Sequence, residues 1–347
     1  MSAAPTQFEV EPIHLRGFCA VLMASAAMVE VSHMSRAAFP AAWIYGQILL
    51  TPIIADITKL AQSCAAAAAN YEGCEASVGV SLGASLQSLE PVMAKAVAGV
   101  ALAAESLVSG GETRVFTQST GSHQEKSPET IDELLGRLQA VAAEKQIRVE
   151  QSGRHFNLYL PGTQNWSPIP NGSAFDLTSN LVAFAGGGQP GQLSAPEHAA
   201  LQVLKDSGFG SQPGDTATIV GYSEGALVGA NLIAGGAIAK LGGRASGLIS
   251  VGGPISARGI AREIPVISLE HANDLVPKLD LAEHKQTHSW TTVKLPKTAG
   301  LGHSLTSYRQ SVAEMGAAKS AELNDKIAGL LAPGKAVVTD YKAVRAG

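Results

Sequence analysis

Ser223 is the residue whose surroundings best suit nucleophilic chemistry. It lies in Gly221-Tyr-Ser-Glu-Gly225, a match to G-x-S-x-G, with the apolar stretch TATIV before it and the small-residue stretch GALVGA after it. A buried strand followed by a helix predicts a tight turn, where the glycines are needed because side chains would collide with nearby backbone. The helix would point its amino end at the serine and favour negative charge developing there.

Ser81 carries the same pattern, in Gly79-Val-Ser-Leu-Gly83. It follows the polar helical stretch NYEGCEASV instead of an apolar strand, and no loop suited to binding an oxyanion precedes it. We interpret Ser81 as a chance match, because the pattern needs a strand before it and a helix after it.

Asp274 and His303 are the expected partners of Ser223. A serine hydroxyl is a poor nucleophile at neutral pH, so an imidazole must take its proton and a carboxylate must orient that imidazole. Asp274 follows the strand-like PVISLEH, and His303 follows WTTVKL at the start of a helix. Taken singly, the acid could cap a turn and the histidine begin a helix, but their order favours a triad. Asp280 is the rival acid and His271 a rival histidine.

His284 and His288 are spaced four residues apart, as in some metal sites. No third ligand and no H-E-x-x-H pattern accompanies them, so we interpret them as exposed histidines. The sequence therefore predicts chemistry without a metal or an organic cofactor.

The segment Leu160-Pro-Gly-Thr163-Gln164 ends an apolar strand ahead of the serine. A tetrahedral intermediate carries an oxyanion that needs preorganised N–H donors. We expect one from the backbone of Glu224 and the other from Thr163 or Gln164. The alternative is an ordinary strand-end turn, which Pro-Gly forms readily.

The elements that must position these residues alternate between strands and helices from residue 112 onward. Apolar alternation predicts strands in RVFTQST, TATIV, GLISVGG, PVISLEH and WTTVKL, and a hairpin or two successive strands in IRVEQSGRHFNLYLPGT. The polar stretch GSHQEK is expected to be a loop. Helices are expected after Ser127-Pro128, at the capping box Ser194–Glu197, in GALVGANLIAGGAIAKL, and in two final segments around 305–315 and 323–331. The fold class is α/β, with a mostly parallel sheet, helices on both faces and the site at the carboxyl ends of the strands. Residues 164–193 form a long Gly-rich loop, either a lid or a plain connection.

Residues 1–111 differ in composition and are expected to form a separate helical hairpin or bundle. Apolar residues recur there at helical spacing, and Gly110-Gly111 marks the boundary with the second domain, residues 112–347. Such a helical face suits a helical partner or self-association.

Composition excludes several classes of function. The formal net charge of −4 carries no basic footprint for nucleic acid. Cys19, Cys64 and Cys74 form neither a disulfide framework nor a metal-ligand pattern. No Sec-type signal peptide and no apolar stretch of about 20 residues is present, which predicts a cytoplasmic protein or one secreted by another route.

From about Arg114 onward, the motifs LPGT, GYSEG, NDLVP and GHS resemble those of α/β-hydrolases of the lipase and esterase kind. DLVPKLD is similar to the acid segment of class 3 lipases, whereas Tyr222 replaces the histidine common before the lipase serine. The resemblance implies a serine hydrolase acting on a small-molecule or lipid ester, or a thioester. The alternatives are acyl transfer and a catalytically silent scaffold that serves interaction.

The N-terminal region resembles the helical-hairpin substrates of actinobacterial type VII secretion. Tyr71 and Glu75 have the Y-x-x-x-D/E spacing, and Trp43-Ile-Tyr-Gly46 stands where W-x-G is expected, with one residue more. Residues four apart share a helical face, so the pair could form one docking patch. The alternative is that Tyr71 is a packing aromatic.

Overall fold

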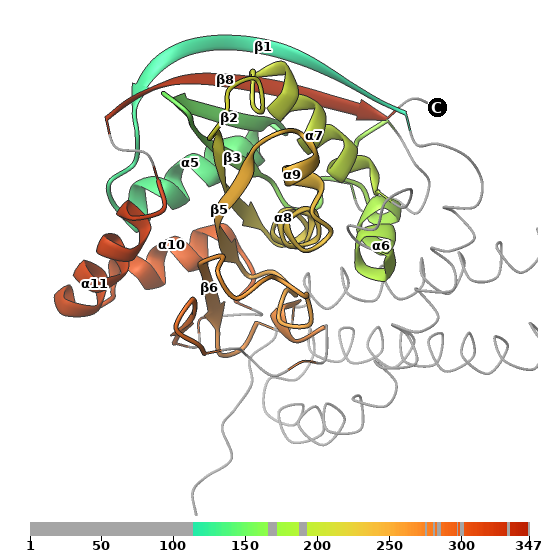
Figure 1. Ribbon diagram of the computed structural model, residues 1–347. Helices are drawn as coiled ribbons and strands as arrows, with labels where there is room; N and C mark the ends of the chain where they lie inside the picture. Colours follow the sequence, from blue (N-terminus) through green and yellow to red (C-terminus); the bar gives the residue numbers. More distant parts are fainter. Residues whose placement is uncertain are drawn as a thin grey trace, which may run out of the picture. The chain divides into compact units, whose positions relative to one another are not determined.

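The computed structural model describes residues 114–165, 172–186, 193–274, 276–279, 282, 286–296, 298, 302–331 and 334–345 (Figure 1). The expected helical domain over 1–111, with Tyr71, Glu75 and Ser81, lies outside the described residues and stays a prediction. Asp280 and His284 also lie outside them.

An eight-stranded sheet forms the centre of the described residues, in the order β1-β8-β2-β3-β4-β5-β6-β7. Neighbours from β3 to β7 pair in parallel, whereas β1–β8, β8–β2 and β2–β3 pair antiparallel. The expected mostly parallel α/β sheet is therefore confirmed. The strands are β1 Val115–Lys126, β2 Ile147–Ser152, β3 His155–Leu160, β4 Thr216–Tyr222, β5 Arg244–Val251, β6 Val266–His271, β7 Trp290–Leu295 and β8 Lys335–Arg345.

Helices cover both faces of this sheet. Alternate residues of the strands point to opposite faces, and the apolar side chains of each face belong to a separate hydrophobic cluster. One cluster joins the sheet to α5, α10 and α11, and the other joins it to α6, α7, α8 and α9, on the opposite side (Figure 1). The helices are α5 Ile131–Ala143, α6 Leu177–Gly186, α7 Ala195–Asp206, α8 Glu224–Ala234, α9 Ala237–Lys240, α10 Leu305–Ala313 and α11 Ala317–Ala328, and η1 Val276–Lys278 is a short 3-10 turn.

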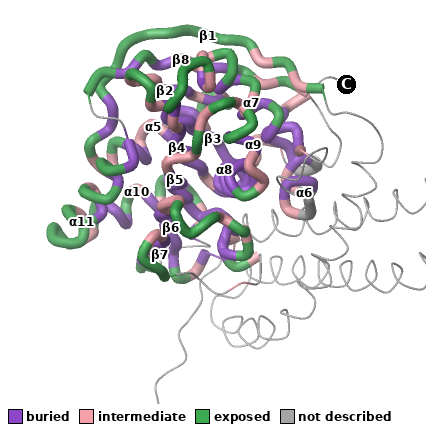
Figure 2. The backbone as a smooth tube through the Cα atoms, in the orientation of Figure 1, coloured by how far each residue is buried: buried purple, intermediate pink, exposed green. Residues whose placement is uncertain are grey.

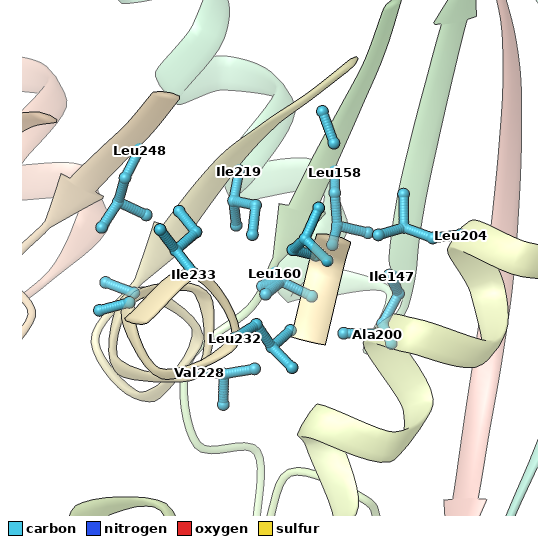
Figure 3. Close-up of a cluster of buried hydrophobic side chains, with 14 of the residues drawn as sticks. Ile147, Leu158, Leu160, Ala200, Leu204, Ile219, Val228, Leu232, Ile233 and Leu248 are labelled. Carbon is cyan, nitrogen blue, oxygen red and sulfur yellow. The ribbon is translucent and has the colours of Figure 1, made fainter. Parts of the chain in front are cut away.

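The helix α8 is the most deeply buried of these elements. Its residues Glu224–Ile233 are all buried, and its apolar side chains meet those of β3, β4 and β5 (Figure 3). The helix lies so close to β4 that a Cβ on Gly229 would come within 2.7 Å of Ile219 Cγ2. Each large apolar side chain buried there contributes roughly 1.5–3 kcal/mol. This packing fixes the strand-helix junction at which Ser223 stands.

Burial differs sharply between the centre and the rim (Figure 2). β4 and β6 are almost wholly buried, whereas β1 is exposed along nearly its whole length. In the part of the chain that the structure describes, no helix is both long and apolar enough to cross a membrane.

Several expected elements are confirmed in detail. The helical face Ile131, Leu134, Leu135, Leu138, Val141 is buried throughout α5. The segment after it is a hairpin, β2 and β3, turning at Gly153, whose φ is +59°. α7 begins with Glu197 accepting a hydrogen bond from the Ser194 N–H at 2.6 Å, which is half of a capping box.

Other expectations were wrong, and each has a physical reason. The polar stretch GSHQEK, predicted as a loop, extends β1 because β8 pairs with it as far as Lys126. The chain does not finish in helices, since Lys335–Arg345 forms β8. The region 164–193 is not loop throughout but contains α6. The helix predicted after Ser223 divides into α8 and α9 at Gly235 and Gly236, the latter with φ of +67°.

Candidate active site

Ser223 is the single residue that connects β4 to α8, and it forms a sharp turn. Its φ of 54° and ψ of −117° lie in a region that residues other than glycine rarely occupy. A Cβ on Gly221 would lie 2.4 Å from the Ala226 nitrogen, and one on Gly225 would lie 2.4 Å from the carbonyl oxygens of Leu160 and Pro161. The two glycines of the motif are therefore required by contacts with backbone.

His303 and Asp274 lie beside Ser223 and are linked to it in series. His303 Nε2 is 2.9 Å from Ser223 Oγ, and His303 Nδ1 is 2.8 Å from Asp274 Oδ2. An ionised carboxylate only accepts hydrogen bonds, so Nδ1–H donates to Asp274 and Nε2 is left to accept the serine proton. Asp274 follows β6, and His303 follows β7 and precedes α10. The structure thus brings the three sequence-predicted residues together at the carboxyl ends of the parallel strands β4, β6 and β7.

Asp274 is held by donors on both of its oxygens. The Tyr308 hydroxyl donates to Oδ2 at 2.7 Å, and the Val276 N–H donates to Oδ1 at 2.9 Å. Burial, followed by the neighbouring Asp274, raises the pKa of Tyr308 above its ordinary value, so the hydroxyl stays protonated as a donor. Tyr308 was not anticipated from the sequence, although it lies on the first turn and a half of the helix after His303.

His303 is positioned from its backbone and from its ring. The Tyr222 hydroxyl donates to the His303 carbonyl oxygen at 2.5 Å, and the two rings stack with centroids 5.2 Å apart. The His303 side chain is 24% exposed and that of Asp274 is fully buried, so the imidazole is the member of this pair open to solvent. Tyr222, noted above as a departure from the lipase motif, holds the histidine loop.

The loop after β3 lies directly against the serine turn. A Cβ on Gly162 would lie 2.9 Å from the Tyr222 ring and 3.1 Å from Ser223 Cβ, so the space for a side chain there is very small. The Gln164 N–H, one of the two expected oxyanion donors, already donates to the Phe175 carbonyl oxygen at 2.9 Å. An N–H that already donates within the protein is less suited to bind an oxyanion, so Thr163 is the better candidate of the two. The Glu224 N–H is the first of α8, where amides have no intrahelical acceptor and the helix dipole is positive.

The rival histidine His271 is part of the scaffold behind the site. It is buried, with Nδ1 2.5 Å from the Gly302 carbonyl oxygen and Nε2 2.9 Å from Ser311 Oγ. Its ring lies 4.0 Å from that of Tyr308. Burial lowers the pKa of His271, which favours its neutral form. It therefore supports the loop that carries His303 and does not contact Ser223.

No metal-binding group of three or more His, Cys, Asp or Glu side chains occurs within the described ranges. Comparison of the chain with protein-family models, with curated proteins and with solved structures finds no match.

Proposed function

We propose that this chain is a serine hydrolase of the α/β-hydrolase kind that cleaves a carboxylic ester or thioester. The observation that carries the proposal is the continuous hydrogen-bonded series from Ser223 Oγ through His303 to Asp274, at 2.9 and 2.8 Å. The position of Ser223 on a strained turn between a strand and a buried helix supports the fold assignment.

The reaction begins when Ser223 Oγ attacks the carbonyl carbon of the substrate and its proton passes to His303 Nε2. Asp274 stabilises the imidazolium that forms. The carbonyl oxygen gains the negative charge and is held by the backbone N–H groups of Glu224 and Thr163. His303 then returns the proton to the leaving alcohol or thiol as the C–O or C–S bond breaks, which leaves an acyl group on Ser223.

The acyl-enzyme is resolved by the reverse sequence with water. His303 takes a proton from water, the hydroxide equivalent attacks the acyl carbon, and the carboxylic acid departs as Ser223 recovers its proton. The residues named suffice for each step, and none requires an oxidant, a reductant or a cofactor.

A fluorophosphonate probe tests the assignment, because it reacts with serines activated by a neighbouring histidine and oxyanion donors. We expect it to label Ser223 and to spare Ser81, which carries the same pentapeptide pattern and serves as the internal control. Ser223→Ala should lower ester hydrolysis by roughly 10⁴-fold or more. Labelling at Ser81, or full activity in Ser223→Ala, would contradict the mechanism.

Absence of labelling in well-folded protein would instead favour a catalytically silent scaffold. A panel of esters of increasing acyl length, assayed on the purified protein, identifies the acyl chain that is preferred. The same panel with added alcohol acceptors separates hydrolysis from acyl transfer.

A further inference from the structure

The side chain of Glu224, next after the nucleophile, is fully enclosed. The residue is 1% exposed, and its Oε1 lies 2.9 Å from the Oγ of Ser179 on α6. Its second oxygen, Oε2, is buried and accepts no hydrogen bond of ordinary geometry among the described residues, although the Thr163 hydroxyl acts on the carboxyl. An ionised carboxylate would be costly in so enclosed a place, whereas a neutral carboxyl is far less so.

Ser179 has two acceptors within reach of its single hydroxyl proton, the Asp176 carbonyl oxygen and Glu224 Oε1. Its Oγ lies 2.8 Å from the Asp176 carbonyl oxygen, which can only accept, and 2.9 Å from the Asp176 N–H, which can only donate. When Ser179 donates to Asp176, the contact with Glu224 is a hydrogen bond only if the carboxyl supplies the proton. A protonated Glu224 therefore satisfies all three contacts of the Ser179 hydroxyl at once, whereas an ionised one competes with Asp176 for the serine proton.

The charges around Glu224 favour the same state. Burial raises its pKa well above the ordinary value, the hydroxyls of Ser179 and Thr163 oppose this, and the carboxylates of Asp176 and Glu197 raise it again. Asp176 at the start of α6 is paired with Arg345 at 3.4 Å. Glu197 on α7 accepts from Asn231 at 2.8 Å. Both acidic neighbours thus repel a charge on Glu224.

Residues 175–180 contact both the Glu224 side chain and the loop after β3, which carries the proposed oxyanion donor. Asn180, next to Ser179, donates to Thr163 Oγ1 at 2.9 Å. The N–H groups of Gln164 and Asn165 both donate to the Phe175 carbonyl oxygen, at 2.9 and 3.2 Å. The residues 175–180 therefore contact the nucleophile helix through Glu224 and the oxyanion loop through Thr163–Asn165.

We propose that Glu224 is a positioning residue whose neutral carboxyl donates a hydrogen bond to Ser179, and so fixes the oxyanion loop relative to the nucleophile helix. The inference rests on the proposed function for its catalytic consequence. If Glu224 ionised, its carboxyl could no longer donate a hydrogen bond to Ser179. The negative charge would also lie on the residue whose own backbone N–H must bind the oxyanion. A site arranged in this way works only while Glu224 stays protonated.

The protonation state is tested by stability measurements that need no activity. In the unfolded chain Glu224 ionises above about its ordinary value of 4.5, whereas the folded protein keeps the proton. The folded state then binds one proton more than the unfolded state. Between the pKa of Glu224 in the unfolded chain and its higher pKa in the folded protein, the folding equilibrium constant therefore falls by up to about tenfold per pH unit. Glu224→Gln has no group that titrates at this position, so it does not show this fall in stability. The difference in the free energy of unfolding between the variant and wild type should therefore grow in favour of the variant as the pH rises through this range.

Glu263→Gln, at an exposed position between β5 and β6, is the control and should show no such trend. A stability difference between wild type and Glu224→Gln that stays flat with pH would show an ionised carboxylate in the folded protein and overturn the proposal. If Glu224→Gln fails to fold, Glu224→Met tests the same point, because it also removes the titrating group and keeps a side chain of similar length. Wild-type stability measured against this variant must again fall with rising pH, and a flat difference overturns the proposal.

The positioning role is tested by amide hydrogen exchange and by kcat. Glu224→Ala should speed exchange of the Gln164 and Asn165 amides by about tenfold or more and lower kcat, and Glu224→Gln should reverse much of both effects. The exposed control Glu263→Gln should change neither. Equal exchange in all variants would refute the positioning role. If the wild type hydrolyses no ester, the proposed function fails, while exchange and stability still decide the role of Glu224.

Discussion

Gly225→Ala is the substitution whose effect follows most directly from the geometry. Gly225 is the second residue of α8, and a Cβ there would lie 2.4 Å from the carbonyl oxygens of both Leu160 and Pro161. These atoms are backbone, so no side chain can rotate out of the way. The alanine must push the loop after β3 away from the helix that carries Ser223.

The size of this movement can be worked out from the contact. Restoring an ordinary separation of 3.4 Å from one of 2.4 Å requires a displacement of about 1.0 Å (3.4 − 2.4). A misplacement of about 1 Å costs roughly 10²-fold in rate, and loss of one oxyanion donor costs roughly 10²–10³. We therefore expect Gly225→Ala to lower kcat by about 10²–10³, with overpacking lowering the free energy of unfolding by about 1–3 kcal/mol.

The assay is hydrolysis of a chromogenic ester under saturating conditions, together with the rate of fluorophosphonate labelling and the denaturation midpoint. Gly259→Ala is the matched control, because a Cβ there meets nothing within 4 Å. It should keep both kcat and stability. A Gly225→Ala protein that stays within threefold (on the order of experimental scatter) of the wild-type kcat would refute the reasoning that this loop supplies an oxyanion donor.

Three further predictions follow from the site and from the sequence. Tyr308→Phe removes a donor from the buried Asp274, so the free energy of unfolding should fall by about 1–3 kcal/mol in chemical denaturation, and kcat should fall with it; unchanged values of both would show that the hydroxyl is dispensable. A fragment beginning at Glu112 should fold and retain ester hydrolysis, since no predicted triad member precedes it; an inactive or insoluble fragment would tie residues 1–111 to the catalytic domain. Tyr71→Ala should stop export in a host with a type VII system, as measured in the culture medium, and normal export of the variant would leave Tyr71 as a packing residue.

Local patterns predicted the parts of the fold that local interactions determine. α5 and the central strands carry apolar residues at the spacing of a helix or in short β-branched runs, and all of them are present. β8 escaped prediction because its partners β1 and β2 lie roughly 190 to 230 positions earlier, as in Arg148↔Asp340 and Val115↔Arg345. The polar end of β1 is a strand only because β8 pairs with it. No window of neighbouring residues contains that information.

The candidate site likewise contains residues that the sequence predicts and residues whose roles it does not. The positions of Ser223, Asp274 and His303 follow from motif order and from the ends of parallel strands. The sequence could not choose between Thr163 and Gln164, because the choice depends on where Phe175 places its carbonyl oxygen. Nor could it assign the roles of Tyr308 and Ser179, which act through contacts made by residues 34 and 45 positions away.

The place of β8 in the sheet has a consequence for the order of events during synthesis. It is the last described strand to leave the ribosome, yet it lies between the first and the second, and pairs with both. Until residues 335–345 emerge, β2 has an open edge and β1 lacks the strand with which it pairs. Such unpaired strands are prone to join other chains, so the nascent protein passes through its most aggregation-prone stage just before completion of the sheet. Chaperone binding to translating ribosomes should accordingly be greatest in this interval.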